Sequence, residues 1–132
     1  MSYKLLASET VGPHSRKGLN FRQDPSAKVK QAKNDDYRNS GWSRGHMAPA
    51  GDFKWSSIAM EETFYFTNCC PQNQSLNAGQ WGTLEKKVRD WANRYGRINV
   101  VTGQLVFDNQ YRTIGFNKVV VPDAFFKAIL AD

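Results

Sequence analysis

The strongest amphipathic pattern in the chain lies between residues 79 and 95. Its apolar side chains recur at the spacing of one helical face. They are Trp81, Leu84, Val88, Trp91, Ala92 and Tyr95. Because Gly96 then supplies a stop signal, we predict a helix from about Gly79 to Tyr95, with Asn77 at or just before its N-terminus. At about 100° per residue, Glu85 falls at the edge of the apolar stripe, and Arg89 lies one turn later.

The Glu85–Arg89 pair has two interpretations. An i,i+4 ion pair on a solvated helix face is the ordinary one, and it contributes only about 0.2–0.5 kcal/mol. A pair at the boundary of the core instead has a partly desolvated carboxylate. The helical pattern alone leaves both interpretations open.

Runs of β-branched and aromatic residues predict strands in much of the remaining chain. The predicted strands are Tyr3–Ala7, Thr63–Thr67, Ile98–Thr102, Tyr111–Ile114, Lys118–Val121 and Phe125–Leu130. The fourth and fifth of these can pair, and a turn is predicted at Asp108-Asn109. A short helix is predicted over Ile58–Thr63, with Ser56 or Ser57 as its N-cap.

Two segments lack periodicity and are predicted to be loops. Gly12–Ser40 is rich in Pro, Gly, Lys, Asn, Asp and Ser, and loops of this length are uncommon without a function. Asn68–Ala78 is rich in Asn, Gln and Ser. Between the two loops, the Gly- and Pro-containing stretch Trp42–Gly51 places Gly45 directly before His46, which predicts a bent backbone that projects the imidazole.

Composition narrows the class of protein. A chain of 132 residues that is 40% hydrophobic and 13% aromatic is typical of one folded domain. The sequence has no apolar run long enough to span a bilayer and no secretory signal pattern at its start. The adjacent Cys69 and Cys70 do not suit a disulfide, and a Cys/His zinc pattern is absent from the sequence.

The net charge of +6 is unevenly distributed. Residues 1–45 hold nine Lys and Arg side chains against four Asp and Glu side chains. This asymmetry suits a polyanionic partner such as nucleic acid. A basic surface that only maintains solubility explains the charge equally well.

His46 is the candidate base, because an imidazole exchanges a proton near neutral pH. A single histidine is more often a packed structural residue, so its role depends on the motifs around it. Six segments carry these motifs in a fixed order. They are Ser43–Gly51, Thr63–Asn68, Pro71-Gln72, Leu76-Asn77, Trp81 and Leu84–Arg89.

In their order and spacing, these segments closely resemble the DNA/RNA non-specific endonuclease family, the ββα-metal (His-Me finger) nucleases of the Serratia nuclease and endonuclease G type. The similarity extends from about Gly18 to the Lys127–Leu130 region. The resemblance implies an α+β fold, with an antiparallel β-sheet core and a ββα-metal motif. It also implies a magnesium-dependent enzyme that cleaves DNA and RNA without preference for sequence or sugar and leaves 5′-phosphate ends. Mn²⁺ is the alternative ion.

By position, the resemblance makes His46 the general base and Asn77 the direct protein ligand of the cation. It makes Glu85 the carboxylate that holds metal-bound water, and Arg89 the contact to the scissile phosphate. Arg44 occupies the arginine position of the motif.

The resemblance also suggests residues around this centre. Asn68 is expected to orient or support it, and Arg16 and Arg22 are expected to contact phosphates. Ser43 departs from the family pattern, because many members have aspartate there, although other members also carry serine. The departure concerns only the structure of the turn.

The chemistry gives an independent reason for these residue types. Phosphodiester hydrolysis needs an activated water, neutralised phosphoryl charge and a stabilised leaving oxygen, and one histidine, one hard cation and one arginine can divide these tasks. Backbone contacts do not read bases, so cleavage of both DNA and RNA and a steep salt dependence are expected. The alternatives are a catalytically silent nucleic-acid-binding module of the same fold and a purely structural basic domain.

The resemblance favours a secreted or periplasmic location. Family members have more chain upstream of Tyr3 and beyond Leu130, so residues 1–132 are expected to form a single nuclease domain without the terminal parts of the full family domain. DNA and RNA are the expected partners, no membrane is expected, and a homodimer remains open.

Overall fold

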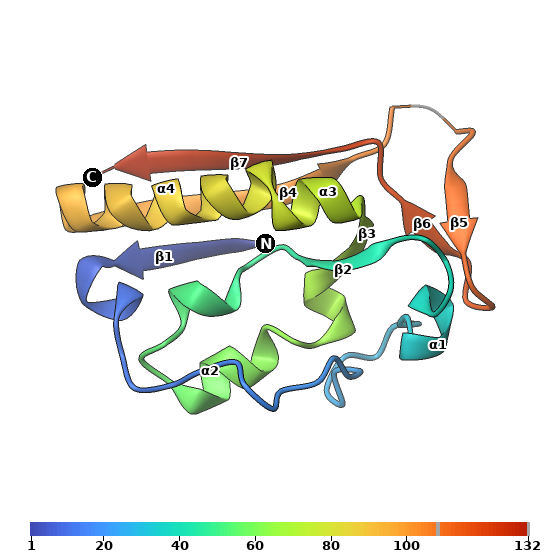
Figure 1. Ribbon diagram of the computed structural model, residues 1–132, viewed down its shortest axis with the longest axis horizontal. Coiled ribbons are helices and arrows are strands. Elements are labelled where there is room, and N and C mark those ends of the chain that lie inside the picture. The colour runs from blue at the N-terminus through green and yellow to red at the C-terminus, as the bar shows by residue number, and fades with distance from the viewer. Residues whose placement is uncertain (108, 132) are drawn as a thin grey trace.

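The structure is a computed structural model that describes residues 1–107 and 109–131. Its largest sheet is antiparallel, with the strand order β1-β4-β7. The strands are β1 (Ser2–Leu6), β4 (Arg97–Leu105) and β7 (Ala124–Ala131). Helix α4 (Gln80–Tyr95) runs along this sheet (Figure 1).

The main hydrophobic core lies between α4 and the sheet. Alternate β4 residues point inward, as the two-residue period of a strand requires. The fully or almost fully buried residues of this core are Leu5, Val88, Ala92, Ile98 and Val100. Because this core fixes α4 against the sheet, it also fixes every side chain that the other face of α4 presents.

A second, smaller layer carries the rest of the chain. Strand β2 (Ser43–His46) pairs antiparallel with β3 (Cys69–Gln72), and His46 lies opposite Cys69. Helix α1 (Asn34–Tyr37) precedes β2, α2 (Ser57–Glu62) lies between β2 and β3, and α3 (Gln74–Ala78) follows β3. Strands β5 (Arg112–Ile114) and β6 (Val119–Val121) form a hairpin at one end of the molecule (Figure 1). Short 3-10 helices cover Ala7–Thr10, Ala50–Asp52 and Phe66–Asn68.

The fold class is confirmed, because antiparallel sheets and helices form an α+β structure in which β2, β3 and α4 give the ββα order. The long helix also agrees closely with the pattern and ends at Gly96, whose φ of 81° few other residues adopt. The Ser56 side chain caps α2 by accepting a hydrogen bond from the Ala59 backbone N–H. The predicted pairing of the two strands around residues 111–121 is also present.

The strand predicted over Thr63–Thr67 is wrong. The chain turns there, and the strand lies at Cys69–Gln72, inside a segment predicted to be a loop. Two of its three aromatic rings, those of Phe64 and Phe66, are buried, but Phe64 packs with Met60 and Ala50, whereas Phe66 packs with a different core cluster around Tyr37. Because its aromatic side chains pack into two different hydrophobic clusters, this turn has a residue composition that is typical of a strand.

Two further differences concern loops. His46 is the last residue of strand β2 and does not lie on a bent turn. The long loop of residues 12–40 is interrupted by α1. The predicted turn at Asp108-Asn109 lies partly outside the described residues, because Asp108 is not among them.

Candidate active site

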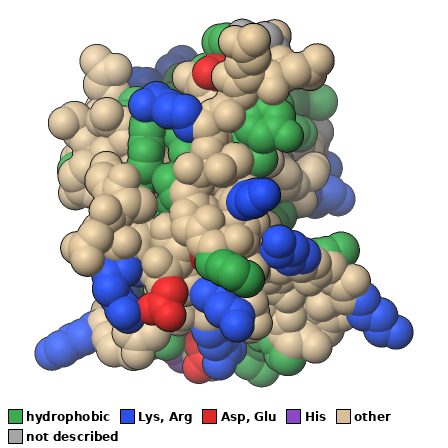
Figure 2. Space-filling view, turned by 90° about the vertical axis from the view of Figure 1, so that its right-hand side faces the viewer, with side chains coloured by type: hydrophobic (Ala, Val, Ile, Leu, Met, Phe, Trp, Pro, Cys, Tyr) green, Lys and Arg blue, Asp and Glu red, His purple; other side chains and the backbone are tan. Residues whose placement is uncertain are grey.

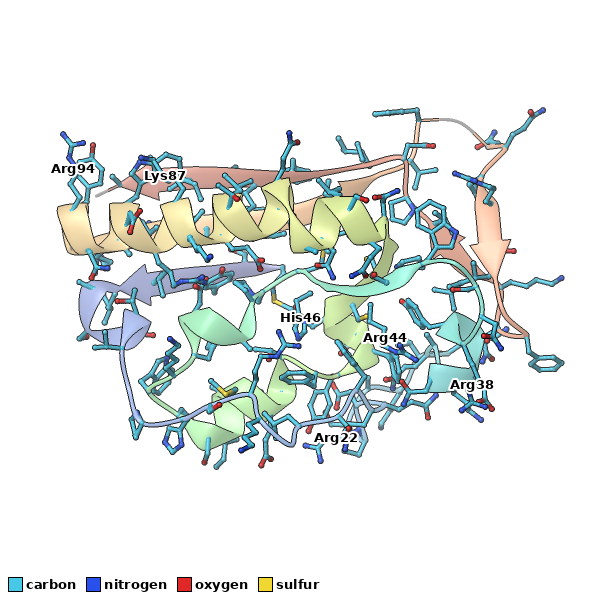
Figure 3. All side chains as sticks on the ribbon, viewed as in Figure 1. Arg22, Arg38, Arg44, His46, Lys87 and Arg94 are labelled. Carbon is cyan, nitrogen blue, oxygen red and sulfur yellow. The ribbon has the colours of Figure 1, made fainter. Side chains whose placement is uncertain are left out.

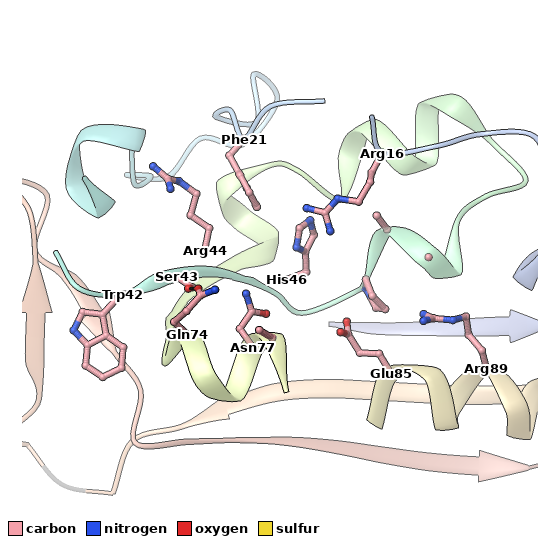
Figure 4. Close-up of a pocket in the computed structure, with 14 residues that line it drawn as sticks. Arg16, Phe21, Trp42, Ser43, Arg44, His46, Gln74, Asn77, Glu85 and Arg89 are labelled. Atoms are coloured by element: carbon pink, nitrogen blue, oxygen red, sulfur yellow. Dashed lines mark hydrogen bonds between the residues drawn. The ribbon is translucent and has the colours of Figure 1, made fainter. Parts of the chain in front are cut away.

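A polar cleft of about 680 Å³ lies between the β2 layer and the helices α3 and α4. Figure 4 shows its two walls. His46 and Arg16 project from one wall, while Asn77, Glu85 and Arg89 project from the helices on the other. Residues that are 61 or more positions apart in sequence, such as Arg16 and Asn77, thus meet in one cavity.

The His46 imidazole is almost completely buried, with 8% of the residue exposed. Its ring packs against Phe21 at 5.0 Å and edge-on against Phe64 at 4.8 Å between ring centroids. This burial, with a smaller contribution from the charge of Arg16, lowers the pKa of His46 from 6.5 to about 4. The imidazole is therefore neutral at physiological pH, as a general base must be.

His46 also presents an unsatisfied nitrogen. Within residues 1–107 and 109–131, its Nε2 atom is buried without a hydrogen-bond partner. Buried polar atoms are normally paired, so an orphan at the wall of a cleft indicates a place for a ligand or a water molecule.

Asn68 fixes the backbone that follows His46. Its side chain is buried; Nδ2 donates to the carbonyl oxygens of Ala48 and Thr63, and Oδ1 accepts from the Ala48 N–H, each at 2.9 Å. The Asn68 carbonyl also accepts from the Met47 N–H at 2.9 Å. The geometry therefore fits the supporting position that the sequence suggested, and its contribution to catalysis stays a prediction.

Lys127 reaches the same segment from β7. Its Nζ atom donates to the Met47 carbonyl at 3.3 Å and to the Thr102 hydroxyl at 3.0 Å, and it lies 4.8 Å from the centre of the Trp81 ring. Burial lowers the pKa of Lys127, whereas the negative charge of Glu85 raises it. Lys127 was missed by sequence reasoning, because nothing near it in sequence marks it as part of a site.

Asn77 and Glu85 bring oxygen atoms into the cleft from two helices (Figure 4). Asn77 lies on α3, whose N-cap Asn73 accepts a hydrogen bond from the Leu76 N–H at 3.1 Å. It therefore lies just before α4, as the pattern predicted, and belongs to a short helix of its own. Burial raises the pKa of Glu85, and the positive charges of Lys127 and Arg89 lower it again.

This donor set fits a hard divalent cation. Amide and carboxylate oxygens are ligands that Mg²⁺ accepts, and Mg²⁺ commonly keeps several waters instead of using an all-protein cage. Among the described residues, no group of three or more His, Cys, Asp and Glu side chains is arranged to hold a metal ion. Asn77 and Glu85 therefore offer oxygen donors that could hold a hard divalent cation in the cleft.

Arg89 is held by an aspartate that the sequence analysis did not select. Its Nη1 atom lies 3.0 Å from Oδ1 of Asp52, a residue that is only 1% exposed. The Tyr3 hydroxyl donates to the other Asp52 oxygen at 2.6 Å. Gly51 leaves room for the pair, because a Cβ atom there would lie 2.8 Å from Arg89 Nη1. Arg89 thus pairs with Asp52 and not with Glu85, so the interpretation as a simple i,i+4 surface pair is wrong.

Arg16 and Arg44 both line the cleft. Arg16 extends beside His46, with its guanidinium 5.2 Å from the centre of the Phe64 ring (Figure 4). Arg44 lies two residues before His46 on β2, so the two side chains share one face of the strand. Its Nε atom donates to Asn34 Oδ1 at 2.9 Å, which ties α1 to the cleft.

Ser43 and Arg22 occupy different positions. The Ser43 hydroxyl donates to the Gln74 side chain and so joins β2 to α3 at the edge of the cleft. Arg22 lies outside the cleft, where its guanidinium is 5.0 Å from the Tyr65 ring centre and 3.6 Å from Glu61 (Figure 3). The structure therefore brings Arg16 to the site and leaves Arg22 on the outer surface.

Gly45 and Gln72 explain how the two strands approach so closely. The Gln72 side chain is fully buried and lies against Gly45, where a Cβ atom would overlap it. Gly45 is therefore required by the packing of β2 on β3, whereas the sequence analysis attributed it to a bend before His46.

The chain was compared with known proteins. The family model described as DNA/RNA non-specific endonuclease matches residues 2–132. "Nuclease EXOG, mitochondrial" of Xenopus laevis is 43% identical over 136 residues, which cover 96% of this chain and 38% of that protein. "Endonuclease G, mitochondrial" of Homo sapiens is 38% identical over 131 residues, which cover 92% of this chain and 44% of that protein.

A solved structure gives the same result. "Crystal structure of the EndoG/EndoGI complex: Mechanism of EndoG inhibition" superposes with a TM-score of 0.92 at 35% identity, covering 98% of this chain and 58% of that chain. The chain thus spans about two fifths of the length of the curated relatives it matches.

The comparisons also correct one expectation. A secreted or periplasmic location is wrong by this measure, because the matched relatives from frog, human and yeast are named as mitochondrial nucleases. In the described part of the chain, we found no helix with the length and apolar character of a membrane span. The match over nearly the whole chain, with the superposition, shows that this chain belongs to the DNA/RNA non-specific endonuclease family.

Proposed function

We propose that this chain is the catalytic part of a magnesium-dependent nuclease that hydrolyses phosphodiester bonds in both DNA and RNA. One observation carries the proposal: the neutral, unpaired Nε2 of His46 lines the same cleft as the oxygen donors of Asn77 and Glu85. A base and a candidate cation site in one cleft are what the hydrolysis of a phosphodiester requires.

In the proposed mechanism, His46 accepts a proton from a water molecule, and the resulting hydroxide attacks phosphorus. The bond from phosphorus to the 3′ oxygen breaks, a water molecule protonates the 3′ oxygen, and His46 returns its proton to the hydroxide left behind. The products are a 5′-phosphate and a 3′-hydroxyl end. Arg89 and Arg16 contact the non-bridging phosphate oxygens and offset their charge. Asp52 holds the Arg89 guanidinium in place between turnovers.

Asn77 would hold the cation directly, and Glu85 would hold it through water. When bound, Mg²⁺ acts as a Lewis acid that stabilises charge on the phosphoryl and leaving oxygens. The cleft side chains in these roles contact the backbone of the substrate, so they position it without reading its sequence.

The test is plasmid and RNA cleavage in Mg²⁺, in Mn²⁺ and in EDTA. We expect cleavage with either metal and none in EDTA. Removing the base with His46→Ala is expected to lower the rate by about 10²- to 10⁴-fold. The matched control is His14→Ala, which removes the other histidine of the chain and is expected to keep the wild-type rate.

Cleavage that His46→Ala leaves unchanged would contradict the mechanism. Binding of nucleic acid without cleavage in either metal would instead identify a silent binding module. The product ends distinguish the proposed bond cleavage from the alternative, because only 5′-phosphate ends are joined directly by DNA ligase.

A further inference from the structure

A second, smaller cavity of about 230 Å³ lies next to the catalytic cleft. Helix α3 separates the two. Gln74 and Asn77 line the cleft, whereas Leu76 and the N-cap Asn73 line the second cavity. Trp42 lines both cavities, so the second one begins where the cleft ends.

Aromatic and aliphatic side chains share the walls of this second cavity with polar and charged ones. Its rings come from the residue before β2, from β7 and from the segment before β5, and they are Trp42, Phe125 and Tyr111. The Arg112 guanidinium lies 5.1 Å from the centre of the Trp42 ring. Aromatic rings and guanidinium planes are the surfaces on which proteins stack unpaired bases.

The polar groups of the cavity favour a base over a phosphate. Asp123 accepts a hydrogen bond from the Phe107 N–H at 2.8 Å, which fixes its carboxylate in the wall. A carboxylate repels phosphate but accepts a hydrogen bond from the amino group of a base. The amide side chains of Asn73 and Gln110 line the same cavity and can face the edge of a ring.

The volume of the cavity also favours a single base as the ligand. Pockets for drug-sized ligands measure about 300–1,000 Å³, so a cavity of about 230 Å³ takes one ring system and not a whole nucleotide. The sugar and phosphate of that nucleotide would remain in the larger cleft, which is lined by Arg44 and Arg16.

We propose that this cavity is a subsite for one unpaired nucleobase of the strand being cut, beside the scissile phosphate. This inference rests on the proposed function and adds to it a preference for substrate strands that are not paired. A base that is paired in a duplex cannot enter the cavity unless it leaves the stack, which requires energy. Single-stranded or locally unpaired DNA and RNA are therefore the preferred substrates.

The test replaces one base at a time in a single-stranded oligonucleotide by an abasic residue, at each position around the cleavage site. With the wild-type chain, the position that fills the cavity should lose roughly 5- to 150-fold in kcat/KM, which is the contribution of one base–aromatic stack. Tyr111→Ala should show the same loss on the intact oligonucleotide and no further loss on the abasic one. Tyr111→Phe should restore the wild-type pattern.

Tyr111 suits this test because it is 49% exposed and lies before β5, so its truncation spares the core. Tyr95→Ala is the matched control, because Tyr95 is 52% exposed and lies at the far end of α4. We expect Tyr95→Ala to keep the full abasic penalty. Arg112→Ala is a second, independent variant and should also reduce the penalty.

The same oligonucleotides are used for binding in EDTA, where no cleavage is expected. An abasic penalty in the dissociation constant that disappears in Tyr111→Ala supports the subsite even if the protein proves unable to cleave. An equal penalty in the wild type and in Tyr111→Ala, or no penalty at any position, overturns the subsite whatever the cleavage assay shows.

Discussion

At the scale of single residues, the site depends on one buried imidazole. His46 is made neutral by packing against Phe21 and Phe64, and no partner among the described residues satisfies its Nε2. The opposite wall has a carboxylate, Glu85, whose pKa burial raises and nearby cations lower. Burial therefore shifts the two pKa values in opposite directions, and shifted pKa values of this kind are typical of functional sites.

Burial of His46 predicts a dependence of stability on pH. The folded pKa of about 4 lies below the unfolded value of 6.5, so the unfolded state takes up a proton first as the pH falls. The contribution of His46 is complete above about pH 6.5 and is lost towards pH 4. Between pH 7 and pH 5, the wild type should lose about 2 kcal/mol more stability than His46→Asn.

Urea unfolding of both proteins at the two pH values, in EDTA, measures this difference. His14→Ala is the control and should follow the wild type. Equal losses in the wild type and in His46→Asn would mean that the imidazole is solvated in the folded protein.

The residues of the cleft were predictable only where they belong to motifs. His46, Asn77, Glu85 and Arg89 were found in sequence and meet in one cavity. Asp52 was missed, although it is an acidic residue directly after a Pro- and Gly-containing stretch. Its contacts with Arg89 and Tyr3 form only in the folded chain, so the sequence does not reveal them.

At the scale of elements, the sequence predicted correctly the helix whose apolar residues recur with a clear period. The prediction failed where neighbouring side chains pack into two different hydrophobic clusters. Helix α4 has one continuous apolar face, so its period is clear. The segment Thr63–Thr67 has the composition of a strand, yet its rings pack into separate clusters. Strand β3 contains Pro71 and Gln72, which have little strand propensity, and it forms because it packs against β2.

The hydrogen bonds from the Asn68 side chain to the backbone of Ala48 and Thr63 give a second prediction. Truncation of Asn68 to alanine would leave the Ala48 N–H and two carbonyl groups without their buried partner. Each unsatisfied buried group costs about 1–3 kcal/mol, so the loss of three partners in Asn68→Ala should lower the free energy of unfolding by about 3 kcal/mol or more.

Urea unfolding at pH 7 measures the change in stability. The exposed Asn20 provides the control, and Asn20→Ala should change stability by less than about 0.5 kcal/mol. A loss in Asn68→Ala no larger than that of the control would show that water replaces the missing amide.

At the scale of the whole molecule, Lys and Arg side chains are scattered over one end of the protein. Figure 2 shows Lys and Arg side chains over the end formed by α1 and the β5–β6 hairpin, with few acidic side chains among them. The cleft itself contains Arg16, Arg44 and Arg89. A backbone-binding surface of this kind releases counterions when it binds, so affinity should fall steeply with salt.

Individual arginines should contribute unequally to that salt dependence. Arg16→Ala should reduce the slope of log affinity against log salt by about 0.7–0.9, the value of one phosphate contact. Arg22→Ala should change the slope less, because Arg22 lies over Tyr65 and close to Glu61, outside the cleft.

Binding of a labelled oligonucleotide in EDTA over a range of salt concentrations gives the slopes. Arg94→Ala, at the far end of α4 in Figure 3, is the control and should keep the wild-type slope. A larger effect for Arg22→Ala than for Arg16→Ala would place the substrate on the outer loop instead of in the cleft.

The contact from Lys127 to the Met47 carbonyl has a consequence for the newly made chain. The two residues are 80 positions apart, which corresponds to roughly 4–16 s of synthesis at about 5–20 residues per second. During that interval, the histidine strand has been made but the strand that supports it has not. The order of synthesis therefore delays completion of this wall of the cleft until β7 has been made.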